Sequence, residues 1–168
     1  MKTINKLAIA MAIILSTGVA SNQVFASGSH SGSHGELKEF DPTESEFGMY
    51  HPDMKPSRTI EIGMADTMTF SPNAISVKED EIILFKHTNN GAITHEFVLG
   101  TPVSLDEHAE MMKKFPGMEH EEPYMLHVAP GKTGQILWKF SESGNFAFGC
   151  LVPGHYEAGM KGNIVVEG

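Results

Sequence analysis

One segment near the C-terminus constrains this chain more than any other: residues 149–166 read GCLVPGHYEAGMKGNIVV, a short loop between two strand-like runs. Cys150, His155 and Met160 follow one another at equal spacing, Cys-x4-His-x4-Met. Proline and glycine residues between them supply turns, so one loop can wrap these side chains around a point. The pattern predicts a metal site at the end of a β-sheet.

The residue types indicate copper. A blue-copper centre combines one thiolate and two imidazoles in a near-trigonal arrangement with a weak axial thioether. Cys150, His155 and Met160 supply three of these ligands, so the second imidazole must come from elsewhere in the chain. His95 opens the strand-like run HEFVLG after a turn, and His87 lies within the strand-like run FKHTN. From the residues alone, both histidines are candidates.

The first 26 residues have the layout of a secretory signal peptide. Lys2 and Lys6 give a positive start, an apolar run follows over 7–19, and the segment ends at Ala26. A membrane span would need about 20 apolar residues, whereas polar and small residues at 16–18 interrupt this run. We therefore expect export to the periplasm or beyond.

The single cysteine fits export only in a special role. Cysteines of exported proteins are normally paired because they meet oxidants, and Cys150 has no possible partner within the chain. A free thiol, an intermolecular disulfide and a metal ligand are the alternatives. The ligand role explains why one thiol is kept in an oxidising compartment.

The charge balance limits the partners. Removing the signal peptide takes away two basic residues, which leaves ten basic against 21 acidic residues and a net charge of −11 with His neutral. This acidity disfavours nucleic acid, whose phosphates need Lys and Arg. It suits the attraction of cations.

From Arg58 onward, short β-rich runs alternate with turn residues. These runs are residues 58–64, 73–80, 81–89, 95–100, 134–140, 145–150 and 162–168. Several short strands with regular turn signals predict an all-β sandwich. Residues 104–115, SLDEHAEMMKKF, interrupt the pattern and predict a short helix with Ser104 as its N-cap.

We divide the chain into a signal peptide (1–26), a flexible His/Gly/Ser-rich arm (27–57) and one domain (58–168). The arm is rich in Gly, Ser and Pro and has little apolar surface to bury. Its side chains could also collect copper. Those side chains are His30, His34, Met49, His51 and Met54.

The ligand loop and the HEFVLG run resemble the cupredoxin family of type 1 copper proteins over roughly residues 58–168. The four-residue gap between Cys150 and His155 is similar to that of the auracyanin- and rusticyanin-like group. The Met/His-rich insert is similar to periplasmic cupredoxins associated with bacterial copper tolerance. The resemblance implies a Greek-key cupredoxin β-sandwich with a short inserted helix and a Met/His-rich loop, and it favours His95 over His87 as the fourth ligand.

The residues around the predicted site need separate interpretations. Many family members carry Asn or Ser next to the first His ligand, whereas Glu96 follows His95 here. An acidic neighbour that faced the metal would favour Cu(II) and lower the reduction potential. The large aromatic residues are expected to pack in the core around the site, namely Phe70, Trp138, Phe146 and Phe148.

The insert after residue 100 offers further soft ligands. His108 shares one helical face with methionines three and four positions later, and Met and His together suit both oxidation states of copper. The alternative is that the methionines simply cover the sandwich. The candidate second copper site consists of His108, Met111, Met112, Met118, His120, Met125 and His127.

Two functions fit these residues. The first is periplasmic copper tolerance, through binding and redox chemistry of one type 1 copper and additional weakly bound copper. The alternative is a one-electron carrier in a respiratory chain, with a docking patch around His155 for a cytochrome or another redox protein. The extra Met and His residues favour tolerance.

We expect a binding protein rather than an enzyme, with weak oxidation of Cu(I) left open. A dinuclear copper centre would need a second cysteine. A multicopper oxidase would need a histidine next to its cysteine ligand, whereas Cys150 is flanked by Gly149 and Leu151. We expect no nucleic-acid partner, and no membrane span once the signal peptide is removed.

Overall fold

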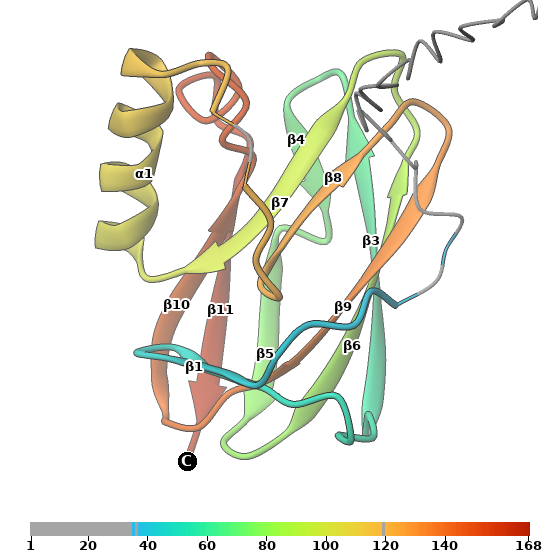
Figure 1. Cartoon of the computed structure of the whole chain (residues 1–168), viewed down its shortest axis with the longest axis vertical. Coiled ribbons are helices and arrows are strands. Elements are labelled where there is room, and N and C mark those ends of the chain that lie inside the picture. The colour runs from blue at the N-terminus through green and yellow to red at the C-terminus, as the bar shows by residue number, and fades with distance from the viewer. Residues whose placement is uncertain (1–34, 36, 119) are drawn as a thin grey trace, which may run out of the picture. The chain divides into compact units, whose positions relative to one another are not determined.

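The computed structural model describes residues 35, 37–118 and 120–168 (Figure 1). These residues form two packed β-sheets and one α-helix, which confirms the predicted sandwich with an inserted helix. The predicted signal peptide lies outside the described residues, as does most of the region before residue 37. The helix found in the described part is too short to cross a membrane.

The strands are arranged in sheets of six and five. The first sheet runs β1 (Thr43–Ser45), β2 (Gly48–Tyr50), β9 (Thr133–Lys139), β6 (Ile82–Asn89), β3 (Arg58–Ala65) and β4 (Thr69–Ser71). The second sheet runs β5 (Ala74–Lys78), β11 (Lys161–Glu167), β10 (Gly144–Gly149), β7 (His95–Gly100) and β8 (Met125–Val128). The β3–β6 and β5–β11 pairs are parallel and the other pairs are antiparallel, because the chain crosses between the sheets in Greek-key fashion.

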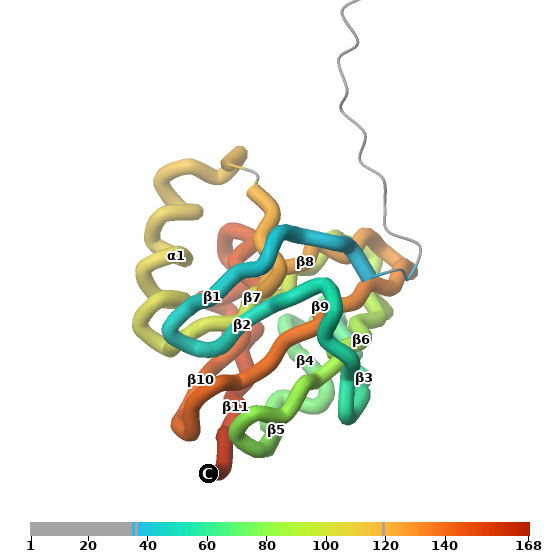
Figure 2. Tube along the Cα trace, turned by 60° about the horizontal axis from the view of Figure 1, so that its bottom comes forward, coloured from blue at the N-terminus to red at the C-terminus, as the bar shows by residue number. Residues whose placement is uncertain are grey.

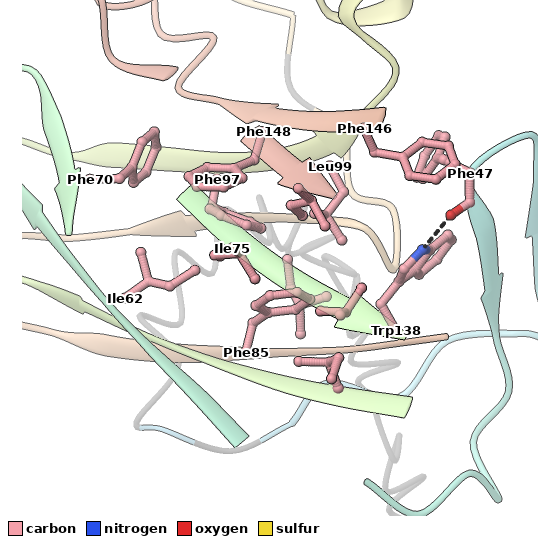
Figure 3. Packing of buried hydrophobic residues seen from close by; sticks show 14 of the residues in the cluster. Phe47, Ile62, Phe70, Ile75, Phe85, Phe97, Leu99, Trp138, Phe146 and Phe148 are labelled. Carbon is pink, nitrogen blue, oxygen red and sulfur yellow. Dashed lines mark hydrogen bonds between the residues drawn. The ribbon is translucent and has the colours of Figure 1, made fainter. Parts of the chain in front are cut away.

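Alternating side chains form the core between the sheets. In β11, every second residue points inward, so that Ile164 and Val166 are buried between exposed neighbours. The aromatic residues expected in the core are all buried there (Figure 3). The indole N–H of Trp138 donates to the Phe47 carbonyl oxygen at 3.2 Å, which satisfies its one buried polar group.

Residues 37–57 depart from the expected flexible arm. They fold onto the six-stranded sheet, where β1 and β2 continue it beyond β9 (Figure 2). Phe47 and Tyr50 are buried, and the Phe47 ring stacks on Trp138 with 5.2 Å between centroids. A few large aromatic side chains anchor the segment, although its average composition is polar and proline-rich.

The helix α1 (Pro102–Lys114) covers the outer face of the five-stranded sheet (Figure 1). It begins earlier than predicted, because Thr101 rather than Ser104 is the N-cap. The Thr101 hydroxyl accepts from the Ser104 N–H at 3.1 Å, and the Ser104 hydroxyl accepts from the Thr101 N–H at 2.9 Å. Under α1 lies a second hydrophobic cluster, formed by Val98, Leu105, Ala109, Met112, Met125, Ala147, Leu151 and Tyr156.

Candidate metal centre

The predicted ligands gather at one end of the five-stranded sheet. His95 is the first residue of β7, Cys150 follows directly after β10, and Met160 directly precedes β11. The central strand β10 pairs with both β7 and β11, so these three strand ends are neighbours. The register of the sheet therefore brings together residues that lie 55 positions apart, as Cys150 and His95 do.

Three of the four predicted ligands meet at one point. One donor atom from each of His95, Cys150 and His155 lies within 4.8 Å of the other two. The Cys150 Sγ is 3.2 Å from His155 Nδ1, and the two imidazole centroids are 5.2 Å apart. His95 and Cys150 are fully buried, while His155 is partly exposed. No other trio of His, Cys, Asp or Glu donors in the described part of the chain is as compact.

The two histidines considered for the fourth ligand, His95 and His87, differ in position and contacts. His95 Nε2 lies 3.0 Å from Asp66 Oδ1, and its Nδ1 is buried without a hydrogen-bond partner among the described residues. That nitrogen is free to donate its lone pair to a metal. Both ring nitrogens of His87 are also buried without a partner among the described residues, but His87 is not part of the ligand cluster. It lies between the sheets, with its ring centroid 4.1 Å from that of Phe97. The geometry thus agrees with His95 and gives His87 a packing role.

Met160 closes the ligand loop. The residue is fully buried, its carbonyl oxygen accepts from the Cys150 N–H at 3.0 Å, and its own N–H donates to the His155 carbonyl oxygen at 3.1 Å. Its backbone is therefore tied to both neighbouring ligands. Gly154 and Gly159 have φ angles of 90° and 97°, a left-handed conformation that lets the loop turn twice within eleven residues.

The surroundings of the Cys150 thiol suit a metal ligand better than a group that ionises near neutral pH. Burial raises the pKa of this thiol to about 12, so without a positive charge nearby it stays protonated. The Glu96 N–H donates to Sγ at 3.2 Å, which partly offsets this effect. A bound cation would displace the proton and stabilise the thiolate.

Glu96 links the two segments that carry ligands. Its side chain is buried, and Oε2 accepts from the Leu151 N–H at 3.1 Å. The other oxygen, Oε1, pairs with His127 Nε2 at 3.1 Å. Burial raises the pKa of the Glu96 carboxyl, and the charge of His127 opposes that rise. Glu96 thus connects the start of β7, where His95 lies, to the loop that carries Cys150.

The helix α1 also holds the ligand loop. The Tyr156 hydroxyl donates to Asp106 Oδ1 at 2.8 Å, and Lys113 pairs with Glu157 at 2.9 Å. Neither contact was expected, since the partners are more than 40 residues apart and no spacing rule connects them. Asp66 was missed for the same reason, because it lies in the turn after β3, 29 residues before His95.

The candidate second site is only partly assembled. His108 on α1 and His120 in the following loop have ring centroids 5.0 Å apart, and His120 Nδ1 is buried without a partner among the described residues. Burial, followed by the charge of His120, lowers the pKa of His108. The His108 imidazole therefore stays neutral to lower pH, and a histidine must be neutral to bind a metal.

The other members of that set lie elsewhere or face solvent. Met112 and Met125 are buried in the cluster under α1, which is the packing alternative weighed for these methionines. His127 on β8 contacts Glu96. Met111 and Met118 have exposed side chains, with 47% and 40% of their surface accessible.

The donor set at the main site fits type 1 copper. A buried thiolate donor, two imidazoles and a neighbouring methionine are the ligands such a centre uses. A structural zinc site would instead favour a closed set of Cys and His ligands. Partial exposure of His155 leaves one ligand near the protein surface.

Comparisons with known proteins also indicate copper binding. Residues 57–167 match the family model described as copper binding proteins of the plastocyanin/azurin family. The copper-resistant cuproprotein CopI of Rubrivivax gelatinosus is 42% identical over 138 residues, covering 82% of this chain and 81% of that protein. The protein of the same name from Vibrio cholerae is 34% identical, covering 71% and 72%.

Solved structures share the fold. Auracyanin B superposes with a TM-score of 0.58 at 20% identity, covering 73% of this chain and 97% of that one. Reduced auracyanin from Roseiflexus castenholzii gives 0.59 at 21% identity, covering 68% and 100%. The sandwich, the cluster of His95, Cys150 and His155, and the match over 57–167 lead to one assignment. The chain belongs to the plastocyanin/azurin family of copper-binding proteins.

Proposed function

We propose that this chain is an exported copper-tolerance protein that holds one type 1 copper with His95, Cys150, His155 and Met160. The names of its relatives from Rubrivivax and Vibrio support the tolerance role, and the apolar N-terminal segment supports a periplasmic location. Bound copper would supply one-electron chemistry by cycling between Cu(I) and Cu(II). The protein's role is binding and redox buffering of copper rather than turnover of an organic substrate.

One observation carries this proposal. One donor atom from each of His95, Cys150 and His155 lies within 4.8 Å of the other two, and His95 Nδ1 is buried without a partner among the described residues. A buried imidazole nitrogen without a hydrogen-bond partner is unfavourable, and the neighbouring thiol becomes a soft anionic ligand once a cation displaces its proton. A single cation between them would occupy the imidazole nitrogen and be bound by the thiolate.

The test is copper titration of the purified mature protein, followed by visible absorption. We expect an intense thiolate-to-Cu(II) charge-transfer band that saturates at one copper and is absent in Cys150→Ser. Met160→Leu should keep the band with a changed position, since the axial thioether tunes the site. If no such band forms in the wild-type protein, the type 1 assignment fails.

We further propose that His108 and His120 bind additional copper, assisted by the exposed thioethers of Met111 and Met118. The close pair of imidazoles, one with a buried unpartnered nitrogen, supports this site. Copper stoichiometry decides it. His108→Gln with His120→Gln should lose copper beyond the first equivalent and leave the charge-transfer band intact. Unchanged stoichiometry would assign these residues a structural role only.

Electron transfer to a redox protein is the second candidate function. The 3.2 Å contact between Cys150 Sγ and partly exposed His155 gives a short route from the buried donor to the surface. Growth on copper separates the two roles. Deleting the gene should sensitise cells to copper if tolerance is the function, while normal copper growth with impaired respiration would favour the carrier.

A further inference from the structure

We propose that Asp66 is a positioning residue for the copper site. It fixes the His95 ring with Nδ1 toward the metal, and its carboxylate increases electron donation from that imidazole. The inference deepens the proposed function and rests on it, since it assumes that His95 ligates copper. Nothing in the spacing of the ligands points to Asp66, which lies in the turn between β3 and β4 of the opposite sheet.

The contact is direct and directional. Asp66 Oδ1 lies 3.0 Å from His95 Nε2, and Oδ2 accepts from the Ala92 N–H at 2.7 Å. A carboxylate only accepts hydrogen bonds, so the imidazole proton resides on Nε2 and the lone pair on Nδ1. That Nδ1 is the buried atom without a partner among the described residues. The carboxylate thus selects the tautomer that a metal ligand requires.

The surrounding loop makes room for Asp66. A Cβ atom at Gly91 would lie 1.9 Å from Asp66 Oδ1, so any side chain at that position would displace the carboxylate. Asn89 fixes the same loop independently, because its side chain donates to the Ile93 and Val128 carbonyl oxygens at 2.8 Å. Asn89 therefore holds part of this loop without Asp66, whose Oδ2 contacts the Ala92 N–H while Oδ1 faces the His95 ring.

A carboxylate hydrogen-bonded to a ligating imidazole raises the basicity of the ligand. A more basic imidazole stabilises Cu(II) more than Cu(I), because the higher charge gains more from electron donation. Asp66 should therefore lower the reduction potential of the site. A purely structural contact would instead change the affinities of both oxidation states by the same factor.

The test compares Asp66→Ala and Asp66→Asn with the wild-type protein. Affinities for Cu(II) and Cu(I) are measured by chelator competition, and the potential by voltammetry. Asp66→Ala should weaken Cu(II) binding by roughly 10–100-fold and Cu(I) binding by less. Each tenfold excess loss for Cu(II) raises the potential by about 59 mV. Asp66→Asn should raise the reduction potential less than Asp66→Ala, because its one amide oxygen can still accept a hydrogen bond from either Ala92 or His95.

Asp41→Asn is the matched control, since it removes one exposed carboxylate that contacts none of the four predicted ligands. The proposal would be overturned if Asp66→Ala lost Cu(II) and Cu(I) affinity by the same factor, or if its reduction potential equalled that of Asp41→Asn. A second experiment on the metal-free protein tests the positioning role without depending on copper binding. The ¹⁵N shifts of the His95 ring should report the Nε2–H tautomer in the wild type and a mixture in Asp66→Ala, and identical tautomer populations would refute the positioning role.

Discussion

At the scale of single residues, the site depends on polar groups with specific hydrogen-bond partners. The carboxylate of Glu96 satisfies the Leu151 N–H, Asp66 holds His95, and Cys150 receives one backbone N–H. Such groups are costly to leave unpaired in a protein interior. Their removal should therefore reveal which contacts the fold needs and which serve the metal.

Glu96 provides the first prediction. Glu96→Ala leaves the Leu151 N–H buried without an acceptor, so we expect the metal-free protein to lose about 1–3 kcal/mol of unfolding free energy. Glu96→Gln keeps an oxygen in place and should lose less than half as much, because His127 is partly exposed and solvent can replace its partner. Urea denaturation measures both variants. An equal loss would mean that the charge, and not the hydrogen bond, is what matters.

His87 provides a prediction about pH. Burial lowers its pKa from 6.5 to about 3, so between these values the unfolded chain binds a proton that the folded chain does not. Stability should therefore fall as the pH drops from 6.5 toward 3, by up to about 1.4 kcal/mol per pH unit. In His87→Leu this part of the slope should disappear.

Urea midpoints of the metal-free protein at several pH values test that slope. His51→Leu is the control, since its side chain is half exposed. A wild-type slope retained in His87→Leu would show that carboxyl groups alone cause the acid sensitivity.

At the scale of elements, α1 and the loop that carries Cys150, His155 and Met160 form one unit. The helix buries its inner face in the cluster under α1 and reaches the loop through Tyr156 and Glu157. The insert that carries the candidate second copper site is therefore mechanically connected to the first site. Its outer face exposes Val103, Met111 and Phe115.

The Tyr156–Asp106 hydrogen bond should contribute more than the neighbouring ion pair. Tyr156→Phe keeps the buried ring and removes only the hydroxyl, so we expect a loss of about 0.5–1.5 kcal/mol in unfolding free energy. Lys113→Met breaks exposed ion pairs with Glu110 and Glu157 and should change stability less than Tyr156→Phe does. Hydrogen exchange of residues 150–160 should increase in Tyr156→Phe. Unaltered exchange in that variant would show that the helix does not restrain the loop.

The segment before β3 should be required for stability. Phe47 is 7% exposed and packs on Trp138, so Phe47→Ala should cost about 3–5 kcal/mol. Val103→Ala serves as the control, because the Val103 side chain on α1 is exposed. It should change stability by no more than about 0.5 kcal/mol. Thermal unfolding of the metal-free proteins checks this. A small effect at Phe47 would restore the interpretation of residues 37–57 as an arm.

At the scale of the whole molecule, an acidic protein surrounds a site that opens at one partly exposed histidine. The full chain has a formal net charge of −9. Long-range attraction and repulsion of small redox partners follow from such a charge and are screened by salt.

We expect the copper-loaded protein to exchange electrons faster with a cationic metal complex than with an anionic one of similar driving force. Raising the ionic strength should slow the first reaction and speed the second. Stopped-flow kinetics at several salt concentrations measure both rates. Equal rates that do not depend on salt would indicate that the surface around His155 is locally neutral, and that this surface rather than the net charge controls association.

Local patterns predicted most of the fold and the core of the site. Seven strand-like runs and the loop with Cys150 and Met160 are contiguous in sequence, so their periodicity and spacing were readable. The short strands β1, β2, β4 and β8 were not among these runs, and burial of the segment with β1 and β2 depends on contacts of Phe47 with the distant Tyr124 and Trp138. Asp66 shows the same limit at the site, since its contact with His95 exists only once the two sheets pack.

The ligand loop has one further consequence. Gly149 and Lys161, at its two ends, are partners across the β10–β11 ladder, so the loop is a closed excursion from an otherwise continuous hairpin. Residues can be inserted, deleted or exchanged within it without shifting the register of any strand. Evolution can therefore retune or replace the chemistry of such a protein by editing eleven residues, while the scaffold is inherited intact.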